Sequence, residues 1–326
     1  MTRELTADRG DAGQRLDRVL SRHLSDVTIA TRTRIQRWIA DGLVAVNGSS
    51  SRRVARRVAA GDIVSVTLPP RAQRPVMMAE ATPLVVLFED EHLAIVDKPP
   101  GVVCHPTHAH ATGTMMNALL WLAREWPAPQ RPSLVGRLDK WTSGLLLVAK
   151  TAVVHAALQR TLADRGSIKE YLALVYGDVR PERGQISLRL SRDRVDRRRV
   201  AASTSTGAFS LTTYERVAAI EAPDTTLSLL RCRLGTGRTH QIRVHLAARG
   251  WPIVGDPVYG EPRWGAVADP TVSAALAGFP RQALHASRVA FQHPVTGERI
   301  DVESPPPDDM RGILDALGFA LAAAIK

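Results

Sequence analysis

Residues 136–148 constrain the possible fold of this chain more than any other stretch. A glycine and a short polar loop lead into an apolar run at residues 145–148, which fits a buried strand. The loop carries a single carboxylate, Asp139, between Arg137 and Lys140. A solvated surface turn with a weak ion pair is the simpler interpretation of such a residue. The alternative is an ionised aspartate held on a loop that enters a core strand.

The sequence of this stretch favours the second interpretation, an ionised aspartate held on a loop. The string Arg-Leu-Asp-x-x-Thr-Ser-Gly-Leu-Leu-Leu begins at Arg137 and resembles the catalytic segment of the RluA-type pseudouridine synthases. This resemblance implies that Asp139 is the catalytic residue and that Arg137 and Thr142 contact the substrate. The family usually has histidine where this chain has Gly136, whereas the RsuA-type sister family has glycine there. The contact made by that histidine is therefore left open.

A second motif follows at residues 169–173. The segment Lys169-Glu-Tyr171-Leu-Ala alternates like a half-buried strand, so that Lys169 and Tyr171 share one face. A sheet aromatic is the ordinary interpretation of such a tyrosine. The Lys-x-Tyr-x-Ala pattern also resembles the second motif of the same family. The resemblance implies that Tyr171 stacks on the target base and lies near the proton that must move.

A third motif, at residues 235–246, reads Gly-Thr-Gly-Arg-Thr-His-Gln-Ile-Arg-Val-His-Leu. Its spacing predicts a helix preceded by a glycine loop, a type of loop that can bind phosphate. With the Gly-x-Pro-Ile-x-Gly-Asp-x-x-Tyr-Gly string that starts at Gly250, it resembles the RluA type and not the RsuA type. The resemblance implies that one arginine pairs with Asp139, with Arg238 as the first choice and Arg243 as the second. His240, Ile242 and Arg243 are predicted substrate contacts.

Composition fits a partner that is a polyanion. The chain has 326 residues, a formal net charge of +11 and a pI near 10.5, which favours nucleic acid first and an anionic membrane second. Two cysteines fit a reducing compartment. No signal peptide and no membrane span is visible, and we expect a cytoplasmic protein without a membrane partner.

Residues 14–68 predict a small module with two amphipathic helices, an Asn-Gly turn and two strands. Their order resembles the S-four-type RNA-binding module of a ribosomal protein, although a helix pair with a solvated basic face is the alternative. We predict an RNA-binding domain over residues 1–70, a linker over 71–80 and a catalytic domain over 81–326. The predicted RNA contacts of the module are Arg15, Arg34, Arg37, Arg52, Arg53, Arg56 and Arg57.

Two further clusters of polar residues support weaker predictions. Cys104, His105, His108 and His110 are residue types that bind zinc, but no second ligand group follows them, and we predict no metal site. Residues 192–199 form a basic insertion that either contacts RNA phosphates or remains solvated.

Taken with the resemblance, these motifs predict a monomeric RNA pseudouridine synthase of α+β fold. We expect a mixed, mainly antiparallel sheet with flanking helices and a central cleft, plus the small module. The reaction conserves atoms, so no cofactor is expected. Large-subunit ribosomal RNA is the favoured substrate and transfer RNA the alternative. A non-catalytic RNA-binding protein and a metal hydrolase built on the histidine cluster are the competing hypotheses.

Overall fold

The computed structural model describes residues 2–27, 29–69, 77–107, 109–164, 166–193, 195–196, 199–222, 225–260 and 263–319. The chain forms two compact units, Met1–Val76 and Met77–Lys326, and each has its own hydrophobic core. Most of the predicted linker lies outside the described residues. No helix in the described ranges is long and apolar enough to cross a membrane.

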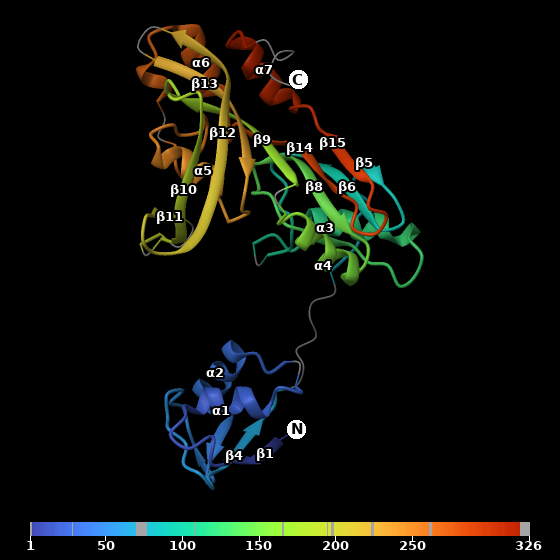
Figure 1. Cartoon of the computed structure of the whole chain (residues 1–326), viewed down its shortest axis with the longest axis vertical. Helices are drawn as coiled ribbons and strands as arrows, with labels where there is room; N and C mark the ends of the chain where they lie inside the picture. Colours follow the sequence, from blue (N-terminus) through green and yellow to red (C-terminus); the bar gives the residue numbers. More distant parts are fainter. Residues whose placement is uncertain are drawn as a thin grey trace. The chain divides into compact units, whose positions relative to one another are not determined.

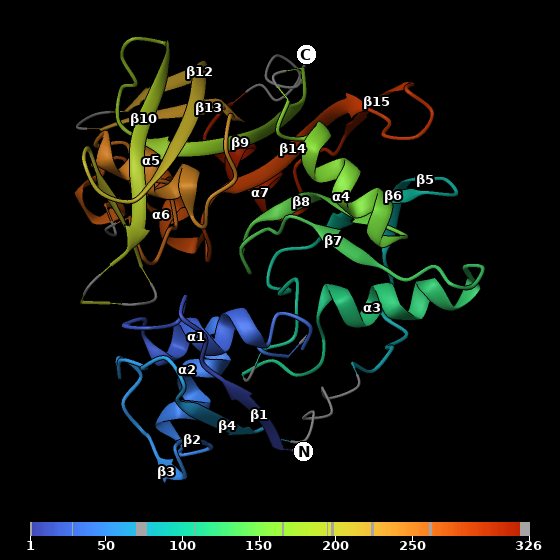
Figure 2. The ribbon, with the colours of Figure 1, turned by 60° about the horizontal axis from the view of Figure 1, so that its bottom comes forward.

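The N-terminal unit packs two helices on a small antiparallel sheet (Figure 2). The strands pair in the order β1-β4-β2-β3. The helices bury an apolar stripe that includes Leu16, Leu20, Ile35 and Ile39 against the sheet, as amphipathic helices do. The elements are β1 (Thr2–Thr6), α1 (Leu16–His23), α2 (Arg32–Ala40), β2 (Val44–Val46), β3 (Ser49–Ser50) and β4 (Ile63–Thr67).

The predicted Asn-Gly turn joins β2 to β3. Asn47 and Gly48 both have positive φ, 51° and 74°, which is the backbone that a two-residue hairpin turn requires. The Asn47 side chain also accepts a hydrogen bond from the Ile63 amide at 2.8 Å. The turn is thereby tied to β4. The strand β1 was not predicted from the sequence, because Leu5 is its only apolar residue and no alternation of apolar and polar residues marks it.

The C-terminal unit is built on one large mixed sheet with the strand order β11-β10-β12-β13-β9-β14-β8-β6-β5. β15 pairs with β14, and β7 pairs with β8. Among the described strands only β14 and β8 run parallel. The predicted α+β fold with a mainly antiparallel sheet is therefore confirmed. The strands are β5 (Val85–Glu89), β6 (Leu93–Lys98), β7 (Ser133–Val135), β8 (Ser143–Ala149), β9 (Ile168–Tyr176), β10 (Arg183–Arg192), β11 (Val200–Ser203), β12 (Ala208–Ala222), β13 (Thr225–Leu234), β14 (Leu284–Gln292) and β15 (Arg299–Glu303).

Helices cover both ends of this sheet (Figure 1). One pair, α3 and α4, packs on the β6–β8 end, and α5 lies against β10, β11 and β12. Residues of α6 and α7 join the core around β9 and β13. The helices are α3 (Met115–Leu122), α4 (Ala152–Thr161), α5 (Gln241–Ala248), α6 (Pro270–Gly278) and α7 (Asp308–Ala316), with short 3₁₀ turns at Ala123–Glu125 and Trp264–Ala266.

The strand β8 is buried on both faces. Leu145 and Leu147 share a core cluster with α4, whereas Leu146 and Val148 share one with α3. Alternate side chains of a strand point to opposite faces, so a strand between two helices needs apolar residues at every position. This explains the uninterrupted apolar run that the sequence shows after the Asp139 loop.

The glycine at the start of β8 permits the parallel crossing with β14. Gly144 has a φ of +106°, and a Cβ placed there would lie 2.2 Å from the Ala286 carbonyl oxygen. A side chain at this position would clash with backbone, which cannot move aside. Gly144 therefore lets β14 approach the loop that carries Asp139.

Candidate active site

Asp139 lies on the loop between β7 and β8, and two buried cationic side chains, Lys98 and Arg281, donate hydrogen bonds to the backbone of that loop. The Lys98 ammonium donates to the carbonyls of Pro99, Val102 and Lys140 at 2.7, 2.8 and 3.0 Å. The Arg281 guanidinium donates to the Trp141 carbonyl at 3.0 Å. Both side chains are almost completely buried. The backbone directly after Asp139 is therefore held at two consecutive carbonyls.

Sequence reasoning missed both of these cations as parts of the site. Lys98 stands in a Lys-Pro-Pro-Gly segment, and neither Lys98 nor Arg281 is among the predicted site residues. Burial lowers the pKa of Lys98 to about 8. Arg281 has a partner in Asp309, at 2.6 Å.

Arg243 of α5 is the residue that pairs with Asp139. Its Nη1 donates to Asp139 Oδ2 at 2.9 Å. Its Nε and Nη2 donate to the two carboxylate oxygens of Asp256 at 2.7 and 2.8 Å. Asp256 is buried and also accepts from the amides of Val258 and Tyr259. The guanidinium is thus fixed by a bidentate pair on one side and presents its remaining arm to Asp139.

The prediction that Arg238 makes this pair is wrong. Arg238 precedes α5, and its guanidinium lies 3.5 Å from the Phe209 carbonyl oxygen. Arg243 lies inside the helix, where its side chain is only 5% exposed and reaches both Asp139 and Asp256. The helix therefore directs Arg243, the second choice, toward Asp139. Arg238 is an exposed residue of the cavity wall.

His240 and Arg137 complete the polar edge around Asp139. His240 Nε2 lies 3.8 Å from Asp139 Oδ1, and its Nδ1 lies 2.9 Å from the Tyr259 hydroxyl. Burial lowers the pKa of His240, although the Asp139 charge opposes that shift, so the imidazole is neutral at pH 7. Arg137 Nη2 donates to the Thr239 hydroxyl at 3.1 Å, which joins the Asp139 loop to the loop before α5.

Tyr171 on β9 lies at the junction of two core clusters. Burial raises the pKa of its hydroxyl, and the Asp139 charge raises it further. The phenol is therefore protonated at neutral pH. Lys169 and Tyr171 both line the cavity, as the period of two predicted. Lys169 donates to the Leu162 carbonyl at 2.9 Å.

Asp139, Arg243 and Tyr171 line one cavity of about 440 Å³, a size typical of small-molecule sites. Its wall combines the Asp139 loop with β9, β14 and the loop before α5. Thr142 is buried, and its hydroxyl lies 3.3 Å from the Gln282 side-chain amide. The structure thus brings together all of the predicted catalytic and substrate-binding residues, and the predicted RNA-binding arginines belong to the N-terminal unit. The predicted residues in the wall are Arg137, Asp139, Thr142, Tyr171, Arg238, His240, Ile242 and Arg243.

Comparison with known proteins shows the family of this chain. A family model described as RNA pseudouridylate synthase matches residues 92–248. Ribosomal large subunit pseudouridine synthase D of Nitrosomonas europaea is 40% identical over 316 residues, which span 97% of this chain and 88% of that protein. The chain belongs to the RNA pseudouridine synthase family.

A second relative and a solved structure also match this pseudouridine synthase. An uncharacterised RNA pseudouridine synthase of Bacillus subtilis is 36% identical and covers 96% of this chain and 97% of its own length. The solved structure of human RNA pseudouridylate synthase domain containing 1 matches with a TM-score of 0.53 and 26% identity, over 70% of this chain and 86% of that one. The predicted RluA-type RNA isomerase is thereby confirmed.

The predicted RNA-binding arginines of the N-terminal unit lie mainly at its surface. Arg15 is half-buried and donates from Nε to Asp17 at 2.9 Å. Burial alone would raise the pKa of Asp17, but hydrogen bonds from Arg15 and Gln36 outweigh it and lower the pKa to about 2. Arg57 donates to the Gly13 carbonyl at 2.8 Å. The exposed arginines of the set are Arg34, Arg37, Arg52, Arg53 and Arg57, and Arg56 is half-buried.

Two of the weaker predictions fall partly on residues without a described position. His108 of the Cys-His cluster lies outside the described residues, as do Arg194, Arg197 and Arg198 of the basic insertion. The Cys104 thiol exchanges hydrogen bonds with the Leu138 backbone at 3.3 and 3.4 Å. Cys104 therefore packs under the Asp139 loop, and the absence of a metal at the histidines stays a prediction.

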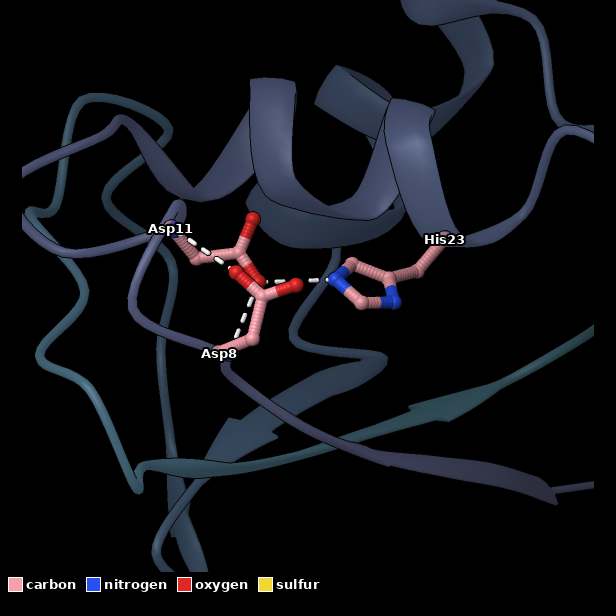
Figure 3. Close-up of side chains that lie close together, drawn as sticks. All are labelled: Asp8, Asp11 and His23. Atoms are coloured by element: carbon pink, nitrogen blue, oxygen red, sulfur yellow. Dashed lines mark hydrogen bonds and ion pairs between the residues drawn. The ribbon is translucent and has the colours of Figure 1, made fainter.

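Within the described part of the synthase, one group of three side chains has ligand atoms close enough for a metal ion: Asp8, Asp11 and His23 (Figure 3). Its carboxylates already have cationic partners. Arg22 donates to Asp8 at 2.7 Å and to Asp11 at 2.9 Å, and His23 Nε2 lies 2.7 Å from Asp11. A divalent cation would have to displace the Arg22 guanidinium, so the group is a closed ion-pair network.

We expect chelation to leave this synthase unchanged. Treatment with EDTA followed by desalting should alter neither the melting temperature nor the rate of pseudouridine formation, because Arg22 supplies the charge that a metal would supply. Differential scanning fluorimetry and a tritium-release assay on RNA labelled at uridine carbon five measure the two quantities. Stoichiometric zinc in the protein, with activity lost on its removal, would contradict this expectation.

Proposed function

We propose that this synthase isomerises uridines of large-subunit ribosomal RNA, with Asp139 as the catalytic anion. The relative in Nitrosomonas europaea bears the name ribosomal large subunit pseudouridine synthase D, and so does one in Pseudomonas aeruginosa that is 37% identical over 94% of this chain. The observation that carries the proposal is the Asp139–Arg243–Asp256 arrangement at the wall of a nucleoside-sized cavity.

The chemistry needs an anion at a fixed position. Pseudouridine forms when the bond between uridine N1 and the ribose C1′ breaks, the base turns and C5 bonds to C1′. C5 then loses its proton and N1 gains one, so the product is an isomer of uridine. The Asp139 carboxylate either attacks the sugar or the base or assists proton removal from the sugar, and each of these routes uses its negative charge. Arg243 holds that carboxylate with one arm while Asp256 fixes the other two. The anion is therefore preorganised before the substrate binds.

Tyr171 supplies the surface on which the base rests. Its ring lies in the cavity wall between the two core clusters, where a flat base stacks well. The raised pKa of its hydroxyl means that the phenol enters the reaction protonated. Tyr171 therefore enters proton transfer as a phenol, directly or through water, and not as a standing phenolate base.

The target uridine must leave its RNA helix to reach this cavity, as in other enzymes that act on a base. Arg137 stands beside Asp139 and is anchored to Thr239, so it fills the gap or holds the backbone of the flipped nucleotide. Thr142, His240 and Ile242 shape the pocket, and Arg238 at its rim contacts phosphate. The N-terminal unit adds RNA affinity through its arginines. We infer that a monomer working in the cytoplasm suffices for these steps.

Pseudouridine mapping tests the proposed substrate. Ribosomal and transfer RNA are mapped from cells with the gene, without it, and with the gene restored as wild type or as Asp139→Asn. We expect sites in large-subunit ribosomal RNA to vanish on deletion and to return only with the wild-type gene. Changes confined to transfer RNA would replace the ribosomal assignment by the alternative substrate. An unchanged map of both RNAs would count against catalysis.

The salt dependence of RNA binding tests the role of the N-terminal unit. A protein that begins at residue 77 keeps the complete catalytic unit but lacks the arginines of the module. We expect it to bind RNA more weakly and with a smaller slope of log K against log salt, because each lost phosphate contact removes about 0.7–0.9 from that slope. Filter binding at four salt concentrations provides the comparison. Equal slopes for both proteins would remove the module from the RNA interface.

A further inference from the structure

Trp141 is an exposed aromatic residue two positions after the catalytic aspartate. Trp141 is 41% exposed to solvent, although tryptophan is a residue that folding tends to bury. The ring packs on Gly101, where an added Cβ would lie 3.1 Å from the ring edge. Exposed tryptophans that stand alone need no special explanation, so exposure is only the first observation.

The second observation is that hydrogen bonds hold the backbone of Trp141 in the same loop as Asp139. The Lys140 carbonyl before it accepts from the Gly101 amide at 2.9 Å and from Lys98 at 3.0 Å. The Trp141 carbonyl itself accepts from Arg281 at 3.0 Å. The backbone is therefore held on both sides of the indole, which presents a rigid aromatic surface. A preorganised aromatic side chain binds at a low entropic cost.

The third observation is the charge that accompanies the ring. Lys140 Nζ lies 5.4 Å from the centre of the Trp141 ring and 3.4 Å from His110 Nε2. Proteins that hold single-stranded nucleic acid combine aromatic rings, on which bases stack, with cations that contact the phosphates. The pair Lys140 and Trp141 has both components at adjacent positions.

Distance selects the nucleotide that this pair can reach. Trp141 is two residues from Asp139, and two residues span at most about 7 Å along the chain, so the bases within reach lie one or two stacking steps of about 3.4 Å from the target. A uridine flipped to Asp139 leaves its neighbour without a stacking partner. We propose that Trp141 is a stacking platform for the base adjacent to the target uridine and that Lys140 contacts its phosphate. This inference rests on the proposed function, since it takes RNA as the substrate.

The full-length protein offers a matched control for the test. Trp121 of α3 is 38% exposed and also carries a cation on its ring, Arg124 at 3.3 Å. Neither tryptophan lines the cavity itself, but Trp141 lies on the loop that carries Asp139, whereas Trp121 lies on α3. Trp141→Ala, Trp141→Phe and Trp121→Ala are compared with wild type on an unmodified in vitro transcript of large-subunit ribosomal RNA. Melting temperatures establish that each variant is folded.

We expect Trp141→Ala to raise KM about tenfold, within the range for loss of one stacked base, with kcat within about twofold of wild type. Trp141→Phe should restore KM to within about threefold, because phenylalanine also stacks. Trp121→Ala should leave both constants unchanged. The quenching of tryptophan fluorescence by RNA should fall in both Trp141 variants, since phenylalanine does not report in that band.

Two results would overturn the platform. One is a KM for Trp141→Ala within twofold of wild type. The other is a fall in kcat that phenylalanine does not reverse, which would mean that Trp141 only supports the Asp139 loop. If wild type modifies a transfer RNA pool and not the ribosomal transcript, the ribosomal assignment fails by itself. The same variants are then compared on that pool, where the KM ratio decides the inference independently.

Discussion

Replacing Asp139 by asparagine is expected to abolish pseudouridine formation, with a fall in kcat of about a thousandfold or more, as for loss of a group that acts on the reacting atoms. Asparagine keeps the shape of the side chain and removes its charge, so the variant tests the anion and little else. The measurement is single-turnover pseudouridine formation with enzyme in excess. RNA affinity should be nearly unchanged, because contacts with many phosphates dominate it.

The same variant should remain folded, for a reason that the structure supplies. A buried arginine that loses its sole carboxylate partner costs about 3–5 kcal/mol. Arg243, however, keeps its bidentate pair with Asp256 when Asp139 is neutralised, and the Asp139 side chain is 24% exposed. We expect a loss of about 1–3 kcal/mol in the free energy of unfolding. A folded Asp139→Asn protein that still isomerises uridine near the wild-type rate would disprove the central claim.

Replacing Arg243 by lysine is expected to lower kcat by about a hundredfold or more and to lower the free energy of unfolding by about 3 kcal/mol. The arginine divides three donors between two carboxylates. A single ammonium cannot reproduce that planar fork, so either Asp139 or buried Asp256 loses its partner. Single-turnover kinetics and urea unfolding measure the two effects.

Arg238→Lys is the matched control for that substitution. It changes an arginine five residues away that contacts a carbonyl at 3.5 Å and no carboxylate among the described residues. We expect kcat within a few-fold of wild type and an effect confined to RNA binding. If Arg238→Lys were the inactive variant and Arg243→Lys the active one, the assignment of the clamp to Arg243 would be reversed.

The confusion between these two arginines shows where sequence reasoning reaches its limit. Residues 241–246 are all buried, so α5 has no polar face whose period would single out Arg243. The partner of Arg243 is 104 positions away, and the Gly-Asp string that contains Asp256 showed only a family likeness. The choice between Arg238 and Arg243 requires the direction of each side chain, which the sequence does not give.

The features that could be predicted were local. The strand β8, the Asn-Gly turn and the shared face of Lys169 and Tyr171 each follow from the residues of one short segment. Lys98 and Arg281 could not be found in this way, because they hold carbonyls at positions 140 and 141 from elements far away in the chain. Lys98 donates only to backbone carbonyls among the described residues, and the carboxylate partner of Arg281, Asp309, is 28 positions away, so no short-range spacing reveals either cation.

The two-sided burial of β8 has a consequence for how this enzyme loses activity on heating. The amides of the strand that follows Asp139 lie between α3 and α4, and such amides exchange with solvent chiefly when the whole unit opens. Loops that carry catalytic groups are ordinarily among the first parts of a protein to loosen. Here the aspartate lies four residues before the start of a strand whose residues are all buried. Inactivation and cooperative melting should therefore coincide, with no inactive yet folded state between them.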